Sequence, residues 1–344
     1  MAPLPWRAVD GGYFRAIDGT GMTTRGVLER LADGAFHTEA ELAGFLALDA
    51  LSLRERLAAL EADGLPLRRD PARGVALPWP VELLDAGRIC ADLPDVVAGS
   101  MGTLDVRWEV DSTNNVLRRS PAAPDLSCLF AERQSAGRGR RGRRWLSPPG
   151  LNIQMSVCKD FRAGVAALGG LSLAVGVMLL RALAAVGVAG DMGLKWPNDV
   201  LARGAKLAGI LIELDAVRDA GCRAVVGVGV NLRLPVAVRA AAGQETIDVA
   251  ELLGGVSLSR NDFAACLLRE LVCGLDCFAT EGFAAFAADF ARSDLLRGRL
   301  LQVTGAEGVF EGIGDGIDER GALRVRTPRG VRELDSGEVS VRVA

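Results

Sequence analysis

The spacing of apolar residues changes twice along the chain and separates three regions. Between about residues 23 and 78, leucines recur three and four positions apart, which predicts three short amphipathic helices. Thr38 and Glu41 have the spacing of a capping box at the start of the second helix. The segment 66–78, PLRRDPARGVALP, then has the turn residues expected between two short strands. Three helices followed by a two-stranded wing predict a winged helix-turn-helix.

The central region combines two periodicities. Four apolar, often β-branched runs bounded by turns predict strands: LSCLFAE, LNIQMSV, GILIEL and RAVVGVGVNL. Residues 166–187 and 261–279 have the longer spacing of helices. Together these patterns predict an α+β fold with a mixed sheet covered by helices.

The last region, after Arg297, consists of short alternating runs between glycine-rich turns, which predict a small β-barrel. We therefore expect three domains: an N-terminal extension with the winged helix-turn-helix (1–85), a central domain (86–294) and a C-terminal barrel (295–344). A chain of 344 residues is long enough for two or three domains with a well-buried core.

Composition narrows the class of protein. The net charge of −3 gives no global positive field that would attract nucleic acid or acidic lipid, so any basic function must be local. The seven cysteines form no C-x-x-C pair and have no histidine nearby, which argues against a disulfide framework or a zinc site. This cysteine usage indicates a reducing compartment, and we expect a cytoplasmic protein.

One stretch tests whether the chain enters a membrane. Residues 163–180 carry no charge and reach the length of a membrane candidate. Glycines interrupt them, Arg181 follows, and predicted sheet strands flank them. We predict a buried helix packed on the sheet and no membrane association, and the N-terminus, MAPLPWRAVDGG, lacks the apolar core of a signal peptide.

The segment 136–145, AGRGRRGRRW, places five arginines among three glycines and matches the dinucleotide fingerprint G-x-G-x-x-G. That fingerprint must open a helix, but two consecutive prolines follow shortly after, at 148 and 149. A single arginine cluster on an acidic protein offers few phosphate contacts for nucleic acid. Glycines let the backbone approach a ligand, and arginines present planar forks to carboxylate or phosphate oxygens. We therefore predict a clamp over a small anionic ligand, with a solvated charged loop as the alternative.

Three further segments carry chemical groups: DSTN at 111–114, KWPNDVLARGAKLAGILIE at 195–213, and GVGVNL at 227–232. Lys195 and Lys206 are separated by a hairpin turn, ARG, which predicts that they lie on adjacent strands. Glycines within strands reduce stability, and a closely packed ligand is one reason to keep them. Small residues facing a helix are the alternative. The glycines concerned are Gly209, Gly227 and Gly229.

These segments, in this order and together with a winged helix and a terminal barrel, resemble the biotin protein ligases, in particular the bacterial form that also represses the biotin operon. The resemblance covers nearly the whole chain. It implies a central fold similar to class II aminoacyl-tRNA synthetases and lipoate ligases, with an SH3-like terminal barrel. It also implies that biotin and ATP form biotinyl-5'-adenylate with release of pyrophosphate. Biotin then passes to one lysine of a biotin carboxyl carrier domain of a carboxylase.

The resemblance assigns site residues by matching position. It implies a biotin pocket formed by Ser112, Thr113, Asn114, Gln134, Gly137, Arg138, Lys206, Gly209, Gly227 and Gly229. It implies an ATP and adenylate site formed by Arg138, Gly139, Arg140, Arg141, Trp145, Lys195, Asn198 and Asn231, with Trp145 stacked on adenine. Mg²⁺ would enter with ATP near Asp199 and Asn231, held mainly by phosphates and water because no dense carboxylate cluster is present.

The assigned roles make chemical sense. The biotin carboxylate is itself the nucleophile towards the α-phosphorus, so the protein needs only to position the substrates and neutralise charge. Arg138 and Lys206 would hold the two anions together and stabilise the phosphoryl oxygens. In the second step the acceptor amine must be neutral, and we hypothesise that Asp199 orients or deprotonates it. The loop at 137–144 is expected to be mobile when empty and to order over the ligand.

The N-terminal region departs from what DNA binding requires. Residues 23–76 contain seven arginines and no lysine against nine acidic residues, whereas phosphate-binding domains are usually basic. The candidate DNA contacts are Arg54, Arg56, Arg68, Arg69 and Arg73. Two functions stay open, a ligase with a structural first domain and a ligase that also binds a DNA operator. A lipoate-type ligase is disfavoured.

The resemblance also implies a homodimer formed through the central sheet. His37 is interpreted as a turn or capping residue, and Trp196 as a core residue.

Overall fold

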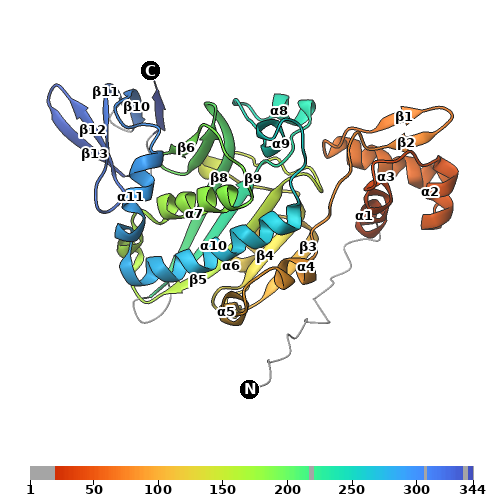
Figure 1. Cartoon of the computed structure of the whole chain (residues 1–344), viewed down its shortest axis with the longest axis horizontal. Coiled ribbons are helices and arrows are strands. Elements are labelled where there is room, and N and C mark those ends of the chain that lie inside the picture. Colours follow the sequence, from red (N-terminus) through yellow and green to blue (C-terminus); the bar gives the residue numbers. More distant parts are fainter. Residues whose placement is uncertain (1–19, 217–220, 306–307, 336–339, 344) are drawn as a thin grey trace. The chain divides into compact units, whose positions relative to one another are not determined.

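The computed structural model describes residues 20–216, 221–305, 308–335 and 340–343, with side chains described from residue 24 onward. The chain divides into two compact units, Met1–Pro80 and Val81–Ala344 (Figure 1).

The first unit contains three helices and a two-stranded antiparallel sheet, as the sequence predicts. Its elements are α1 (Thr20–Leu31), α2 (Glu39–Leu46), α3 (Ala50–Ala62), β1 (Arg68–Asp70) and β2 (Gly74–Ala76). The capping box is present, because Thr38 accepts a hydrogen bond from the Glu41 amide and the Glu41 carboxylate accepts one from the Thr38 amide. Thr38 is therefore the capping residue. His37 instead forms a bridge to Val75 and a 3.0 Å hydrogen bond to Asp33.

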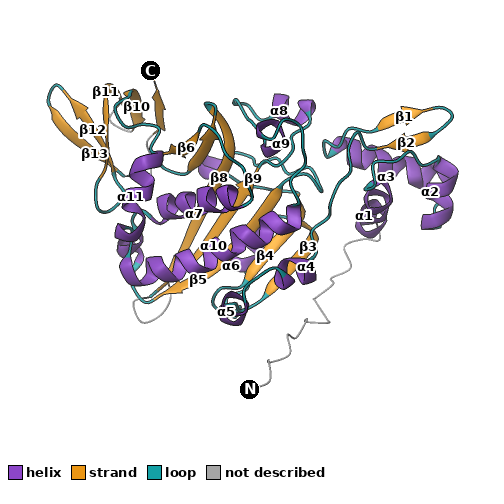
Figure 2. Ribbon diagram, viewed as in Figure 1, coloured by secondary structure: helices purple, strands orange, loops and turns teal. Residues whose placement is uncertain are grey.

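The second unit is built on a seven-stranded mixed sheet in the order β3-β4-β5-β9-β8-β7-β6 (Figure 2). The strands are β3 (Leu104–Val110), β4 (Cys128–Gln134), β5 (Ile153–Phe161), β6 (Met192–Lys195), β7 (Asp199–Ala202), β8 (Ala205–Ala216) and β9 (Cys222–Val230). Only β3 and β4 pair in parallel. The four predicted apolar runs form β4, β5, β8 and β9, and the last three contain β-branched residues, which favour strands.

Two long helices cover one face of this sheet, α7 (Leu171–Ala185) and α10 (Arg260–Glu281). Residues Val165–Ala185 are long and apolar enough to cross a membrane by length and composition alone. In the structure, α7 packs against α10, β6 and β8, and most of its apolar side chains are buried. The predicted buried helix is confirmed.

On the opposite face, the short helix α6 (Thr113–Arg118) contacts β4, β5 and β9. Alternation along the strands separates the two faces, because Val157 and Val226 join the large core while their neighbours Cys158 and Val225 join a small cluster near α6. The sheet face beside α6 is therefore left available for a ligand.

The remaining elements surround the central sheet. The other helices are α4 (Ala86–Ala91), α5 (Asp95–Ser100), α8 (Val236–Ala241), α9 (Val249–Leu252) and α11 (Ala284–Ser293), with the short 3₁₀ turns η1 (Arg140–Gly142) and η2 (Val165–Leu168). A five-stranded antiparallel sheet follows, in the order β13-β12-β11-β10-β14. Its strands are β10 (Leu300–Gly305), β11 (Gly308–Ile317), β12 (Leu323–Thr327), β13 (Gly330–Leu334) and β14 (Ser340–Val343). Trp196 is 2% exposed, in the core as predicted, and its indole Nε1 donates to the carbonyl of Gly321 before β12.

Candidate functional site

A cavity of about 850 Å³ lies against the α6 side of the central sheet. It collects most of the residues assigned from sequence, although they come from segments far apart in the chain. The assigned residues that line it are Ser112, Thr113, Asn114, Gln134, Arg138, Gly139, Arg140, Arg141, Trp145, Lys195, Asn198, Asp199, Lys206, Gly209, Gly227 and Gly229. Arg138 and Lys206 thus open onto one cavity.

The floor of the cavity is a row of residues paired across five neighbouring strands. In order from β5 to β6 the row consists of Gln154, Gly229, Gly209, Asp199 and Lys195. Directly paired residues on neighbouring strands point to the same face, so these five share the cavity side. The second and third members, Gly229 and Gly209, have no side chain and leave this part of the floor flat.

The floor glycines make room for the indole of Trp145. A Cβ atom on Gly229 would lie 2.5 Å from Trp145 Cζ2, and one on Gly209 would lie 3.4 Å from its Cζ3. Gly227 is in an equivalent position beneath Asn114, whose side-chain oxygen a Cβ atom would strike. In the structure, the Trp145 indole therefore requires a glycine at 229, whereas Gly227 faces Asn114 of helix α6, as the alternative of a small residue facing a helix predicts.

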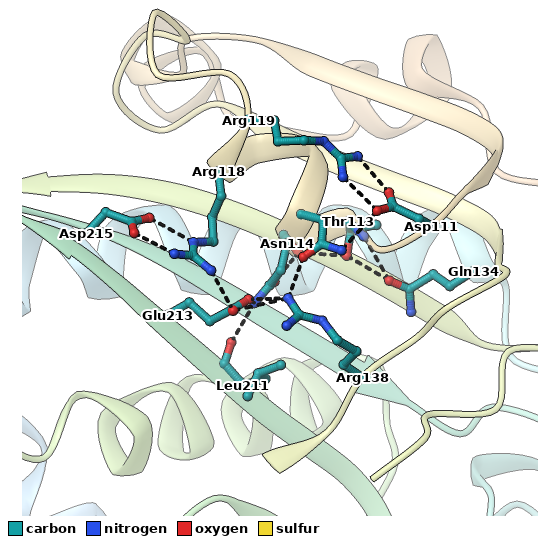
Figure 3. A network of polar contacts seen from close by, with 12 residues as sticks. Asp111, Thr113, Asn114, Arg118, Arg119, Gln134, Arg138, Leu211, Glu213 and Asp215 are labelled. Atoms are coloured by element: carbon teal, nitrogen blue, oxygen red, sulfur yellow. Dashed lines mark hydrogen bonds and ion pairs between the residues drawn. The ribbon is translucent and has the colours of Figure 1, made fainter. Parts of the chain in front are cut away.

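A hydrogen-bonded network fixes the start of α6 against the sheet (Figure 3). The Thr113 amide donates to Gln134 Oε1 at 2.8 Å. The Ser156 hydroxyl is 2.7 Å from Thr113 Oγ1 and 2.6 Å from Asn114 Oδ1. Asn114 Nδ2 donates to Glu213 at 2.9 Å. The side chains that make these contacts are all polar, and Glu213 is the charged one among them.

Glu213 gathers three donors from two segments, as Figure 3 shows. Besides Asn114, it accepts from Arg118 Nη1 at 2.9 Å and from Arg138 Nη2 at 2.9 Å. The Glu213 side chain is 16% exposed, so its charge is only partly screened by solvent. Arg138 also donates to Asn115. The guanidinium of Arg138 is thus held by a carboxylate of the protein itself.

The arginine loop has a defined backbone path. The Gly139 amide donates to the carbonyl of Arg143, and the Trp145 amide donates to the carbonyl of Gly137. Arg140 Nη1 is 3.4 Å from the side-chain oxygen of Asn198. These contacts bring the loop to the KWPND segment. Its mobility without ligand stays a prediction.

Lys206 and Asp199 form an ion pair on the cavity floor. Lys206 Nζ is 2.7 Å from Asp199 Oδ1 and 5.9 Å from the centre of the Trp145 ring. Both side chains are largely buried, at 15% and 21% exposure. An anionic ligand entering here would compete with Asp199 for the ammonium group.

The prediction that Lys195 and Lys206 lie on adjacent strands is wrong. The ARG turn joins β7 to β8, as the pairing of Ala202 with Ala205 shows. A second turn at 196–198, which contains the cis Trp196–Pro197 bond, returns the chain earlier and pairs Lys195 with Asp199. Strand β7 therefore separates the two lysines, although both line the cavity.

Lys195 lies in a strongly positive surrounding. Burial lowers the pKa of Lys195, and the charges of Lys206, Arg342 and Arg143 lower it further, while Asp199 acts in the opposite direction. Arg342, on β14, brings a cation from the C-terminal sheet into the cavity. Together these groups form a cationic end of the cavity suited to phosphate oxygens.

Arg143 and Arg144 of the predicted arginine clamp also line the cavity, but other lining residues were missed from sequence, among them Gln154, Gln244 and Arg342. Arg342 belongs to a strand of ordinary barrel pattern, so no local signal marks it. Gln154 is a polar residue inside the apolar run LNIQMSV, and that interruption could have marked it.

Two assigned residues are not among those lining the cavity, Gly137 and Asn231. Asn231 is 5% exposed, and its Nδ2 donates to the carbonyls of Lys206 at 3.2 Å and Ile247 at 3.4 Å. It supports the strand that carries Lys206. A Cβ atom on Gly137 would lie 2.6 Å from the Trp145 carbonyl, so this glycine lets the loop cross itself closely.

Within the described residues, no group of three or more His, Cys, Asp or Glu side chains could hold a metal ion. Asp199 is the carboxylate among the described lining residues, and Lys206 already neutralises it. This donor set fits a Mg²⁺ ion carried by phosphate oxygens and not by a protein cage.

Four of the five candidate DNA contacts in the first unit have partners within that unit. Arg54 lies 3.5 Å from Glu39, and Arg69 lies 3.0 Å from Glu61. Arg68 of β1 and Arg73 of the turn between β1 and β2 lie over the ring of Phe36. Arg56 is half-buried in α3. These contacts reduce the charge that the unit can offer to phosphates.

Two models of known protein families match segments of this chain. Residues 108–231 match the model of the biotin/lipoate A/B protein ligase family, and residues 301–342 match the biotin protein ligase C-terminal domain.

Individual relatives narrow the class. The chain is 34% identical over 315 residues to the bifunctional ligase/repressor BirA of Escherichia coli, covering 91% of this chain and 95% of that protein. It is 39% identical over 231 residues to the biotin--[acetyl-CoA-carboxylase] ligase of Mycobacterium tuberculosis, covering 64% of this chain and 82% of that one. The biotin protein ligase from Aquifex aeolicus in complex with biotin and ATP matches with a TM-score of 0.59 and 28% identity, over 70% of this chain and 99% of that one. The chain belongs to the biotin protein ligase family.

Proposed function

We propose that this protein catalyses the two half-reactions of a biotin protein ligase. It joins biotin to ATP as biotinyl-5'-adenylate, and it then transfers the biotinyl group to a lysine of a biotin carboxyl carrier domain. The observation that carries the proposal is the single cavity in which Arg138, Lys206 and Lys195 meet the polar cluster around Thr113. Family membership supports the reaction class.

The two ends of the cavity suit the two substrates. The uncharged polar network of Thr113, Gln134 and Ser156 would hold the head group of biotin. Lys195 and Arg342, at the other end, would hold phosphate oxygens of ATP. The biotin carboxylate would then lie between them, next to Arg138 and Lys206, which neutralise it and the α-phosphate during attack.

The transfer step needs an amine without its proton. The acceptor lysine must lose a proton before it attacks the adenylate carbonyl, since a free lysine has a pKa of about 10.4. We propose that Asp199 orients or deprotonates this amine once ligand has taken over Lys206, its partner at 2.7 Å. Mg²⁺, when bound with ATP, would shield the phosphate charges, and Asp199 is the nearby carboxylate that could contact it.

The domains take corresponding roles. We propose that residues 86–294 form the catalytic domain, that residues 295–344 form an SH3-like barrel, and that residues 1–85 contain a winged helix-turn-helix. Arg342 of the barrel lines the cavity, which supports a contribution of that domain to nucleotide binding. We also propose a cytoplasmic protein that pairs through its central sheet.

The experiment for the proposed function uses a purified carrier domain incubated with the protein, biotin, ATP and Mg²⁺. A streptavidin blot should show labelling that depends on both biotin and ATP. A carrier whose acceptor lysine is replaced by arginine should stay unlabelled. If mass spectrometry shows that the carrier gains a lipoyl group with lipoate but no biotinyl group with biotin, the chain would be assigned to lipoate transfer instead.

A second function, repression of transcription, is favoured by one observation. The similarity to the Escherichia coli ligase/repressor covers 91% of this chain, too much to exclude the first unit. Against it stand the acidic composition and the paired arginines described above. A gel-shift assay with operator DNA from the promoters of biotin genes in the same genome, with and without biotin and ATP, tests whether the first unit binds DNA. A ligand-dependent shift would support repression, and its absence would support a structural role of the first unit.

A further inference from the structure

Gln154 is the first member of the cavity floor, on β5. Its sequence neighbours Ile153 and Met155 belong to the large core on the other side of the sheet. Gln154 therefore shares the cavity face with Ser156, two residues along the same strand. Its partner across the ladder is Gly229, which has no side chain to contact it.

The amide of Gln154 is buried and unpaired. The residue is 1% exposed, and neither Oε1 nor Nε2 has a hydrogen-bond partner among the described residues. Its neighbour Ser156, by contrast, contacts both Thr113 and Asn114. Buried polar groups in folded proteins are nearly always paired, so an unpaired amide that lines a cavity points to a ligand that completes it.

The chemistry of the amide selects the kind of ligand group. A carboxamide is neutral and offers one acceptor and two donors, so it pairs best with a neutral group that also has both. Lys195, the cation of the floor row, is at its far end, and the guanidinium of Arg138 is already paired with Glu213. Four strand spacings of about 4.8 Å place Gln154 roughly 19 Å from Lys195. Gln154 therefore lies with the uncharged end of the cavity, away from the phosphates.

We infer that the side chain of Gln154 binds the urea group of biotin, as a specificity-determining residue of this site. The inference rests on the proposed function, which supplies biotin as the substrate. Urea carries N–H donors and a carbonyl acceptor, and both could be met by Oε1 and Nε2 of one amide. Neither the carboxylate chain of biotin nor the phosphates of ATP offer this combination.

The test replaces the amide by a side chain of similar size without donors, Gln154→Met. Calorimetry on the full chain measures the dissociation constants of three acids. Biotin and desthiobiotin both contain the urea, whereas 5-(2-thienyl)pentanoic acid keeps a sulfur ring and the acid chain but lacks it. We expect the variant to bind biotin and desthiobiotin about tenfold more weakly and the thienyl acid with unchanged affinity. Equal weakening of all three acids, or unchanged binding of biotin, overturns the inference.

The melting temperature of the ligand-free protein separates ligand binding from a structural role. An unpaired buried amide is unfavourable, so Gln154→Met should leave the melting temperature unchanged or raise it. A fall of several degrees would show that Gln154 supports the fold and would count against the inference. Gln302→Met, on an exposed position of β10, is the matched control and should change neither quantity. Biotin labelling by the unaltered protein tests the proposed function separately, so the two can fail independently.

Discussion

Arg138 Nη2 lies 2.9 Å from Glu213 Oε2, and this pair joins the arginine loop to strand β8. The same carboxylate holds Arg118 and Asn114. The guanidinium proposed to contact the adenylate is thus bound by an anion of the protein. A ligand carboxylate or phosphate must compete with Glu213 for it.

We predict that Glu213→Gln tightens biotin binding several-fold, because the variant removes the competing charge and keeps an oxygen that Asn114 can donate to.

Arg138→Met should instead slow adenylate formation about a hundredfold, since it removes a donor to the developing charge. Calorimetry with biotin and a single-turnover adenylation assay measure the two effects. If Glu213→Gln weakens biotin binding as much as Arg138→Met does, Glu213 positions the arginine and does not compete for it.

The pair of Lys206 and Asp199 predicts a separation of the two half-reactions. Asp199→Asn should form adenylate at a rate within about threefold of the unaltered protein, but should transfer it to the carrier more than tenfold more slowly. Preformed biotinyl-adenylate mixed with carrier domain isolates the second step. A normal transfer rate in this variant would show that Asp199 has no role with the acceptor amine.

Because the pKa of Lys195 is lowered, we expect ATP binding to take up a proton over a limited range of pH. Burial, with Lys206 and Arg342 nearby, lowers its pKa below the usual 10.5, and a polyphosphate bound beside it should raise that pKa again. Between the two values, ATP binding takes up a proton, so affinity for ATP falls as the pH rises through the pKa of the empty site. Calorimetry at a series of pH values below 10.5, in buffers of different ionisation enthalpy, measures the uptake. It should disappear in Lys195→Met, and an unchanged uptake there would assign the proton to another group.

The lowered pKa of Lys195 also makes the free energy of unfolding depend on pH. The unfolded chain binds more protons at Lys195 than the folded chain between the lowered pKa and 10.5, so this group makes the free energy of unfolding rise with pH in that window. Lys195→Met should flatten this part of the stability curve.

Adding a side chain at Gly229 should disturb the cavity floor by steric conflict. A Cβ atom there would lie 2.5 Å from the indole of Trp145, so Gly229→Ala must displace the ring or the strand. We expect a changed tryptophan emission and at least tenfold weaker binding of ATP. Gly44→Ala, where nothing lies within 4 Å of the added atom, is the control and should leave both unchanged. Normal ATP binding by Gly229→Ala would exclude Trp145 from the nucleotide site.

Much of this fold was predictable because local patterns determine it. The apolar runs of β4, β5, β8 and β9 and the capping box at Thr38 act over a few residues. Strand β3 was not recognised, because its side chains are mostly half-buried and its sequence, LDVRWEV, lacks a continuous apolar run.

The site was predictable as a set of segments but not as a geometry. Motif order brought Arg138 and Lys206 to one cavity, yet the turn at 196–198 placed β7 between the two lysines. Arg342 enters from a separate sheet, and the pairing of Arg138 with Glu213 depends on how α6 docks. Such relationships are fixed by tertiary packing, which no local pattern encodes.

The central claim is that Arg138 and Lys206 act together on one adenylate, and biotin-dependent ATP–pyrophosphate exchange tests it most directly. The unaltered protein should exchange with biotin and not with lipoate, and Lys206→Met should reduce exchange at least a hundredfold, as Arg138→Met does, while each variant keeps its melting temperature within a few degrees. Exchange that persists at the normal rate in either variant would contradict the account.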